Sequence, residues 1–293
     1  MLQFIQYFET NERPEKYFTV VYWDQRGSGM TFSSDTDPTT MTVEQMVEDT
    51  RVVTEYLKQR FGQEKIYLLG HSWGSYLGVK TIEKYPENYH ACIGVGQVTN
   101  QTESERLAYK YMLNHAKEIQ DREVIDKLEK FDPYAVDFPS LNYLIMGRTT
   151  ILNKYRIGHL HMGLTFTDIP KTIFAFDGYT LREKINWFHG ADFSMIYLFP
   201  AILKDDLFVS SVQFTIPFYV IQGAYDYMTS HALAEKYLNI LEAPQKEFFT
   251  FDNSAHSPNM EEPEKFIQIV RKIALENSFM RQEAELYSKY KQY

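Results

Sequence analysis

A serine between two glycines is the first feature of this sequence that could do chemistry: residues 70–74 read GHSWG, a G-x-S-x-G pattern. The apolar run 65–69 comes directly before it, and a helical pattern follows it. A nucleophile elbow needs this strand–turn–helix context, because the tight turn lifts the serine hydroxyl above the sheet. Ser72 is therefore predicted to be a nucleophile, with the backbone N–H of Trp73 as a donor to the oxyanion. The alternative is a turn in which Ser72 only caps the helix.

The glycines on both sides of Ser72 have a steric role in this interpretation. Side chains at Gly70 and Gly74 are expected to collide with neighbouring backbone, because the turn is so tight. Both glycines are therefore expected to be required for the strained conformation of the serine.

A nucleophilic serine needs a base to remove its proton and an acid to orient that base. In this kind of elbow the order along the chain is serine, acid, histidine. Asp226 comes shortly after the apolar run 217–222, and His256 comes shortly after the run 246–251. A parallel sheet presents its chemistry in loops at the carboxyl ends of its strands, so Ser72, Asp226 and His256 are predicted to form a catalytic triad. Taken singly, Asp226 could cap a helix and His256 could be an ordinary loop histidine.

Other histidines have simpler interpretations. His71 is the variable residue of the elbow, and His231 falls in the first turn of a predicted helix. His159 and His161 alternate as a metal-binding pair would, but no third ligand is evident in the sequence. No metal site and no cofactor are therefore predicted.

Strands and helices alternate in the first third of the chain and again near its end, which predicts a mostly parallel α/β sheet flanked by helices. From about 100 to 212, helical stripes separated by prolines replace this rhythm. We predict a core of residues 1–99 and 213–276, a helical cap inserted at 100–212, and a C-terminal tail at 277–293. The predicted strands are 18–23, 65–69, 91–95, 217–222 and 246–251, and the predicted core helices begin at Thr42, at Gly74, near Leu233 and at Pro263.

Composition excludes several classes of protein. The 30 Lys and Arg against 39 Asp and Glu give a net charge of −9, and the absence of a basic run argues against a nucleic-acid partner. A single cysteine, Cys92, excludes a disulfide framework. The apolar stretch 196–203 is too short to span a membrane, and no signal peptide is visible at the start. We therefore predict a cytoplasmic protein with no membrane partner; the sequence leaves its oligomeric state open.

The stretch Asp24-Gln25-Arg26-Gly27, taken with GHSWG, GAYD at 223–226 and SAHS at 254–257, resembles the proline iminopeptidase branch of the α/β-hydrolases. The resemblance implies an α/β-hydrolase fold with a helical cap over the triad. It also implies that acidic cap residues grip the free amino terminus of a substrate; Asp168, Asp177, Glu183 and Asp192 are candidates, but none matches the family pattern, so the substrate-binding residues stay unknown. Asp24 and Arg26 are expected to form a buried pair that braces the loops around the nucleophile, with a surface turn as the alternative.

The chain departs from this family at its start. Such enzymes carry a glycine-rich loop upstream of Asp-Gln-Arg-Gly whose backbone N–H completes the oxyanion hole, whereas the first glycine here is Gly27. The first strands and that loop are therefore expected to be missing, and a partner or another part of the backbone would have to supply the second donor.

Three functions remain open at this point. We expect a serine hydrolase that acts on a small-molecule or short-peptide substrate, first as an aminopeptidase that releases N-terminal residues with a preference for proline. The second hypothesis keeps the same machinery but makes the chain an esterase of small hydrophobic esters. The third is a binding protein that keeps the fold with weak or no catalysis, suggested by the missing oxyanion loop.

Overall fold

A parallel sheet forms the frame of the molecule in the computed structural model, which describes residues 14–162 and 169–290, and the side chains of these except 146, 169, 172 and 278–290. Within these residues the sheet has four strands in the order β1-β2-β3-β4, and all three neighbouring pairs are parallel. The strands are β1 (Ile66–His71), β2 (Tyr89–Val95), β3 (Phe218–Gly223) and β4 (Lys246–Phe251). Their carboxyl ends therefore meet at one edge, where loops can gather side chains.

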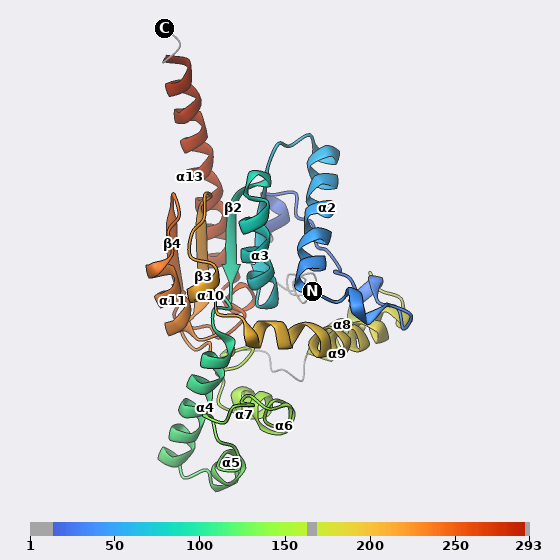
Figure 1. Cartoon of the computed structure of the whole chain (residues 1–293), viewed down its shortest axis with the longest axis vertical. Helices are drawn as coiled ribbons and strands as arrows, with labels where there is room; N and C mark the ends of the chain where they lie inside the picture. The colour runs from blue at the N-terminus through green and yellow to red at the C-terminus, as the bar shows by residue number, and fades with distance from the viewer. Residues whose placement is uncertain (1–13, 163–168, 291–293) are drawn as a thin grey trace.

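The sheet lies between two layers of helices, because alternate residues of a strand point to opposite faces. Cys92 of β2 packs in a cluster with α3 (Trp73–Lys84) and α11 (His231–Ile240). Its neighbour Ile93 packs on the other face with α13 (Pro263–Tyr290). Figure 1 shows this three-layered arrangement, which confirms the predicted α/β fold class.

Helix α2 (Val43–Phe61) begins and ends where its sequence predicts. The Thr42 hydroxyl accepts a hydrogen bond from the N–H of Gln45, and Gly62 closes the helix with a φ of 61°. A left-handed conformation of this kind costs little only for glycine, so Gly62 ends the helix at this residue.

Between β2 and β3, the described residues are helices and turns, with one isolated bridge at Gln213. The longest is α9, whose Pro200 lies inside the helix. Ile169 and Pro170 begin α8, because proline is tolerated in the first turn of a helix. The helices of this segment are α4 (Gln101–Glu118), α5 (Arg122–Leu128), α6 (Leu141–Tyr143), the π-helical η5 (Leu144–Arg148), α7 (Thr149–Lys154), α8 (Ile169–Ala175), α9 (Leu181–Lys204) and α10 (Leu207–Ser210).

The remaining helices are short or C-terminal. Helix α13 continues without a break past Asn277, where the C-terminal tail was expected to begin. The Asn277 side chain is buried and donates a hydrogen bond to the hydroxyl of Tyr219 in β3. The short helices are η1 (Pro14–Lys16), η2 (Gly29–Thr31), η3 (Pro38–Thr40), η4 (Pro86–Asn88) and α12 (Pro258–Glu261).

The strand predicted at 18–23 is wrong, since these residues form no strand. The segment is held by short-range contacts instead: the N–H groups of Tyr17 and Phe18 both bond to the Pro14 carbonyl, and the Tyr22 hydroxyl bonds to Glu15. Its side chains are half-buried or exposed. A β-rich composition becomes a strand only where a partner edge and a packed face are available, and this segment has neither among the described contacts.

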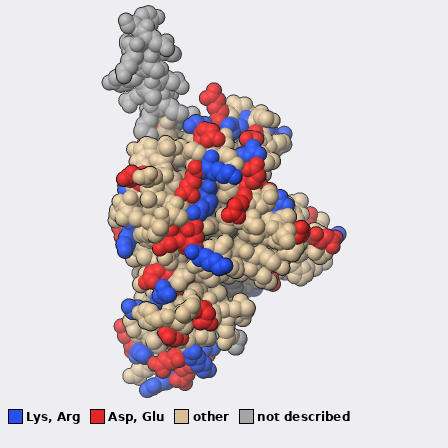
Figure 2. All heavy atoms as spheres, in the orientation of Figure 1, with Lys and Arg blue, Asp and Glu red and all other residues tan. Residues whose placement is uncertain are grey.

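The surface mixes charges of both signs. On the face shown in Figure 2, acidic and basic side chains alternate over most of the elements, with uncharged areas between them. Across the part of the chain that the structure describes, no helix is long and apolar enough to cross a bilayer.

Candidate active site

Ser72 sits on the sharp turn between β1 and α3. Its backbone has φ 56° and ψ −121°, a conformation that is strained for a residue with a side chain. Its N–H donates to the Val95 carbonyl at the end of the neighbouring strand, at 2.8 Å, which fixes the turn to the sheet. The structure thus gives this turn the geometry that a nucleophile elbow requires.

The two flanking glycines differ, which corrects the sequence expectation. A Cβ on Gly70 would lie 2.0 Å from the carbonyl oxygen of Gly74, so this position cannot accept a side chain. A Cβ on Gly74 would meet no atom within 4 Å. Of these two glycines only Gly70 is therefore required by the packing of the turn, because the backbone of Gly74 and Ser75 lies against it.

Helix α3 begins at Trp73, directly after the serine. The first N–H groups of a helix have no partner within it, and the dipole of the helix favours negative charge at this end. The Trp73 N–H therefore belongs to the group of donors that can face an oxyanion beside Ser72. The indole of Trp73 is held by a hydrogen bond of 2.9 Å from its Nε1 to Oε1 of Gln25.

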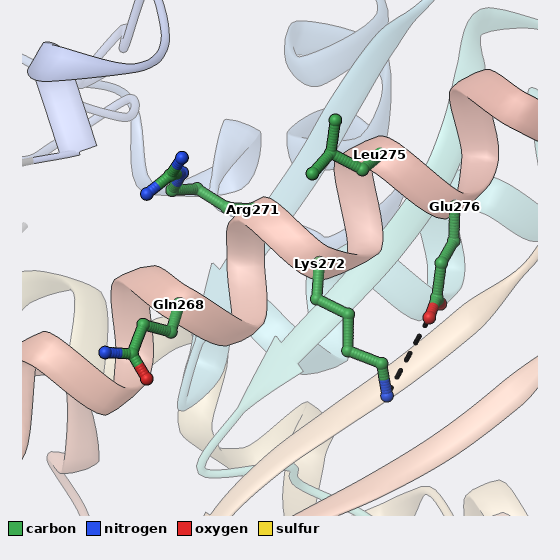
Figure 3. Close-up of a pocket in the computed structure, with 5 residues that line it drawn as sticks. All are labelled: Gln268, Arg271, Lys272, Leu275 and Glu276. Atoms are coloured by element: carbon green, nitrogen blue, oxygen red, sulfur yellow. Dashed lines mark ion pairs between the residues drawn. The ribbon is translucent and has the colours of Figure 1, made fainter.

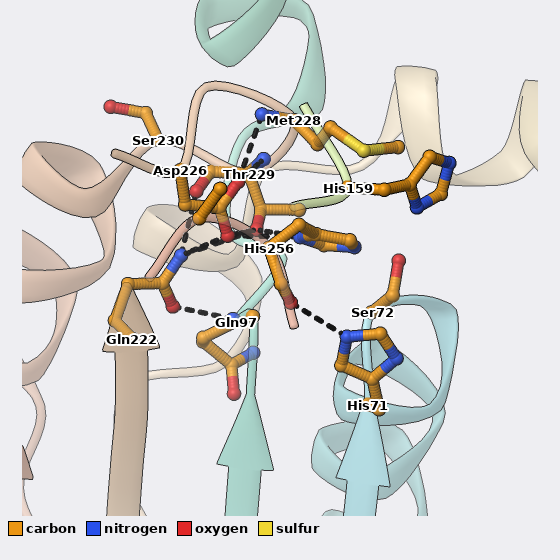
Figure 4. Close-up of polar contacts among 12 residues, drawn as sticks. His71, Ser72, Gln97, His159, Gln222, Asp226, Met228, Thr229, Ser230 and His256 are labelled. Carbon is orange, nitrogen blue, oxygen red and sulfur yellow. Dashed lines mark hydrogen bonds and ion pairs between the residues drawn. The ribbon is translucent and has the colours of Figure 1, made fainter. Parts of the chain in front are cut away.

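Asp226 and His256 lie in contact at the carboxyl end of the sheet. The Nδ1 of His256 is 2.9 Å from Oδ2 of Asp226, and both side chains are about 1% exposed. Because the carboxylate accepts, this ring nitrogen carries the proton, and Nε2 is left as the basic nitrogen. In Figure 4 the hydroxyl of Ser72 points away from the sheet, toward the side where the His256 ring lies.

No hydrogen bond joins Ser72 Oγ to His256 among the described contacts. Hydrogen bonds of this kind are often long before a substrate binds.

The Asp226 carboxylate is oriented by four further donors. Oδ1 accepts from the N–H groups of Met228 at 2.9 Å and Thr229 at 3.0 Å. Oδ2 accepts from the Thr229 hydroxyl at 2.9 Å and from Nε2 of Gln222 at 2.7 Å. Gln222 is the next-to-last residue of β3, so the strand itself positions the acid (Figure 4). These donors hold the buried charge in one orientation, which a lone buried carboxylate could not keep.

His71 has a structural role that sequence reasoning missed. Its Nε2 donates to the backbone carbonyl of His256 at 2.7 Å, and the two rings lie 4.8 Å apart. Burial and the neighbouring His256 lower the pKa of His71 to about 3, so the ring is neutral. In the sequence, the only sign of this role is a histidine at the variable position of the elbow, and that does not specify a contact.

His159 also lies at the site. Its ring centre is 6.1 Å from that of His256, and burial lowers its pKa to about 3. The preceding carbonyl, that of Gly158, accepts a hydrogen bond from the N–H of His256 at 3.1 Å. This segment is therefore attached directly to the loop that carries the predicted base.

The two histidines of the predicted alternating pair point to different places. His161 stacks on Tyr225 with ring centres 3.5 Å apart, while His159 lies beside His256. Among the described residues, no group of three or more His, Cys, Asp or Glu side chains could hold a metal ion.

Glu261 joins the loops on either side of His256. Its carboxylate accepts hydrogen bonds from the N–H groups of Ala255 at 2.7 Å, His161 at 2.5 Å and Met162 at 2.6 Å. Burial raises the pKa of this carboxyl, against the effect of these donors. A single side chain on α12 therefore fixes the segment that precedes His256 and the segment that follows His159.

Asp24 and Arg26 do not pair with each other, which corrects a second expectation. Arg26 forms a two-pronged ion pair with Asp49 of α2, with distances of 2.7 and 2.8 Å. Asp24 accepts from the Met30 N–H at 2.9 Å and from the Tyr179 hydroxyl at 3.1 Å. The contacts of Arg26 and Asp24 therefore tie this loop to α2 and to the segment before α9.

Of the acidic residues considered for the amino terminus of a substrate, Asp168 lies outside the described residues. Asp177 and Asp192 are exposed. Glu183 is bonded to the N–H and hydroxyl of Thr180, where it completes the capping box of α9. None of these described acids is held in a buried position ready for an ammonium group.

A surface groove lies along α13 (Figure 3). It is lined by Gln268, Arg271, Lys272, Leu275 and Glu276, all from this one helix, and Lys272 and Glu276 form an ion pair of 3.8 Å across it. None of the candidate site residues described above lines it.

Comparisons with known proteins agree with this fold. A profile of the alpha/beta hydrolase fold matches residues 5–263. Over 255 residues the chain is 31% identical to a probable aminopeptidase, YbaC, of Bacillus subtilis, covering 86% of this chain and 78% of that one. It is 25% identical over 257 residues to a proline iminopeptidase of Saccharolobus solfataricus, covering 86% and 74%.

A solved proline iminopeptidase from Mycobacterium smegmatis has the same fold, with a TM-score of 0.58 at 16% identity over 89% of this chain and 80% of that one. The resemblance seen in the sequence is thus confirmed by relatives that carry aminopeptidase names. Because the match extends over most of its length, the chain belongs to the alpha/beta hydrolase family.

Proposed function

We propose that this chain is a serine hydrolase with Ser72, His256 and Asp226 as its triad. We further propose that it releases N-terminal residues from short peptides, with a preference for proline. The observation that carries the proposal is the buried Asp226–His256 hydrogen bond at the same sheet edge as the strained Ser72 turn. Relatives named as aminopeptidases support the choice of substrate. Residues 1–99 and 213–276 would be the core, and 100–212 the cap.

The geometry supports the following sequence of steps. Nε2 of His256 takes the proton of Ser72 as Oγ attacks the acyl carbonyl carbon, and the negative charge that forms on the carbonyl oxygen faces the Trp73 N–H. The protonated ring then gives its proton to the leaving amine, and the C–N bond breaks. Water repeats the two steps on the acyl-enzyme and frees the acid. Asp226 stays ionised throughout and stabilises the imidazolium.

A fluorophosphonate tests this proposal because it needs only an activated serine. We expect intact mass to show one adduct on the wild type and none on Ser72→Ala. Ser33→Ala, which changes an exposed serine, should label like the wild type. A folded wild type that takes no adduct would favour the third hypothesis, a binding protein without efficient catalysis.

An esterase of small hydrophobic esters is the second candidate, and the described cap acids favour it. Asp177 and Asp192 are exposed, and Glu183 is engaged in a helix cap. Since none of these three described acids is buried and free for an ammonium group, they give a charged amino terminus no advantage over a neutral acyl group. Comparing proline 4-nitroanilide with 4-nitrophenyl acetate and butyrate separates the two: a higher kcat/KM for the anilide supports the aminopeptidase, and turnover of the esters alone supports the esterase.

A further inference from the structure

A buried ion pair lies behind the predicted acid. Arg148, the last residue of η5, meets Glu105 of α4 through two contacts: Nη2 to Oε1 at 2.7 Å and Nε to Oε2 at 2.8 Å. Glu105 is fully buried and Arg148 is 6% exposed. Such pairs lose hydration on burial and often stabilise the fold no more than apolar residues of the same size, so burial of this pair is weak evidence for a role in stability.

The pair is connected to the loop of Asp226 through one carbonyl. Gln101, one turn before Glu105 on α4, donates from Nε2 both to Glu105 Oε1 at 2.9 Å and to the Met228 carbonyl at 2.8 Å. Nη2 of Arg148 reaches the same carbonyl at 3.4 Å. Two donors from the helical segment between β2 and β3 therefore converge on a single oxygen.

The other end of that peptide group touches the acid. The N–H that shares the peptide plane with the Met228 carbonyl is that of Thr229, and it donates to Asp226 Oδ1 at 3.0 Å. The peptide plane is rigid, so fixing its oxygen fixes the direction of its N–H. Donors on the oxygen also polarise the group and strengthen the bond that its N–H makes.

We propose that Gln101, Glu105 and Arg148 are positioning residues that orient Asp226, and through it His256, by way of the Met228–Thr229 peptide. Glu105 holds the guanidinium and the amide in place, and these two hold the carbonyl. Ser104 adds a parallel contact, since its hydroxyl accepts from the Ser230 N–H at 3.2 Å. The face of α4 that carries residues 101, 104 and 105 thus determines the position of the loop 226–230, which contains Asp226. The inference rests on the proposed function for its kinetic consequences, but not for its structural one.

The test uses variants that break different contacts in the path from Arg148 and Gln101 to Asp226. Arg148→Met removes the charge and both contacts to Glu105, whereas Arg148→Lys keeps the charge but cannot make the two-pronged contact. Gln101→Met breaks the hydrogen bond to the Met228 carbonyl and leaves the ion pair intact. Arg106→Met is the matched control, since Arg106 lies on the same helix and pairs with Glu103 at 3.3 Å without touching the loop 226–230.

Two readouts are measured on each folded variant. The first is the proton resonance of His256 Nδ1–H, which lies downfield of the amides because it is bonded to a carboxylate. The second is the split between kcat and KM on the best substrate. A purely structural role would move neither the resonance nor kcat at a temperature where the variant is folded.

We expect the resonance to shift or broaden in Arg148→Met and Gln101→Met, to return toward its wild-type position in Arg148→Lys, and to stay unchanged in Arg106→Met. A misplaced catalytic group costs about 100-fold in kcat, so Arg148→Met should lose roughly that factor with KM unchanged. A wild-type resonance and kcat in Arg148→Met and Gln101→Met would overturn the proposal. If Arg148→Met does not fold, Gln101→Met decides. If the wild type turns over no substrate, the proposed function fails. The positioning role of Gln101, Glu105 and Arg148 is then tested by the His256 resonance alone.

Discussion

The Nε2 of His71 lies 2.7 Å from the carbonyl oxygen of His256, so the residue before the predicted nucleophile holds the backbone of the predicted base. The two residues are 185 positions apart in the sequence. The contact joins the elbow to the last loop of the sheet, so it links the segments that carry the proposed nucleophile and the proposed base.

Replacing His71 tests this contact. His71→Phe removes the donor while keeping a flat ring, and His71→Gln keeps an N–H donor at a similar distance from the backbone. We expect the rate of fluorophosphonate labelling to fall about tenfold in His71→Phe, equivalent to ~1.4 kcal/mol, and to fall less in His71→Gln. Equal rates in the two variants would show that the hydrogen bond does not position His256.

The two glycines of the elbow offer a matched pair of variants. Gly70→Ala places a Cβ 2.0 Å from the Gly74 carbonyl oxygen, so we expect a loss of ~3 kcal/mol in the free energy of unfolding and no labelling of Ser72. Gly74→Ala has open space and lies in a helix, where alanine gains ~0.5–1 kcal/mol over glycine. Urea unfolding and intact mass give both readouts. A well-folded, labelled Gly70→Ala would contradict the described turn.

Local signals explain what could be predicted from the sequence. Thr42 and Gly62 mark the ends of α2 through their own backbone and capping contacts, and the run 246–251 matches β4 residue for residue. The positions of Asp226 and His256 followed from the ends of two predicted strands. These features depend on neighbours in the chain, so a single sequence contains them.

Features that depend on distant partners could not be predicted. Arg26 pairs with Asp49 rather than Asp24, and Arg148 pairs with Glu105 across 43 residues. The segment 18–23 has the composition of a strand but no ladder partner among the described residues. The propensities and spacing of residues do not determine which surfaces of the folded chain pack together. Whether an ion pair is buried depends on that packing.

Gly96 makes room for the ring of His256. It has a φ of 57°, and a Cβ there would lie 2.9 Å from Cε1 and Nδ1 of the imidazole. Gly96→Ala should therefore push the ring away from its place beside Asp226, in addition to ~1–2 kcal/mol of backbone strain. We expect kcat to fall about 100-fold with a smaller change in KM. Gly62→Ala has the same left-handed conformation with open space around it, so it should lose similar stability and keep full kcat. A kcat in Gly96→Ala equal to that in Gly62→Ala would contradict the steric role.

Acid should unfold this protein at a higher pH than protonation of its carboxylates alone would require. The pKa values of His71 and His159 fall to about 3 in the folded chain, against an ordinary value of 6.5, because burial disfavours the charged rings. Lowered pKa values stabilise the fold fully above pH 6.5, and this contribution is lost as the pH falls from about 6.5 toward 3. Within that window each ring takes up one proton on unfolding.

Each such proton adds ~1.4 kcal/mol per pH unit to the slope of stability against pH. Urea unfolding between pH 6.5 and 4 should therefore show a slope from these two rings of ~2.8 kcal/mol per unit, on top of other groups. His71→Gln should reduce the slope by about half of that amount, since it removes one of the two protons. His231→Gln is a useful comparison, because burial also lowers the pKa of His231, but away from Ser72. An unchanged slope in His71→Gln would mean that His71 already titrates normally in the folded protein.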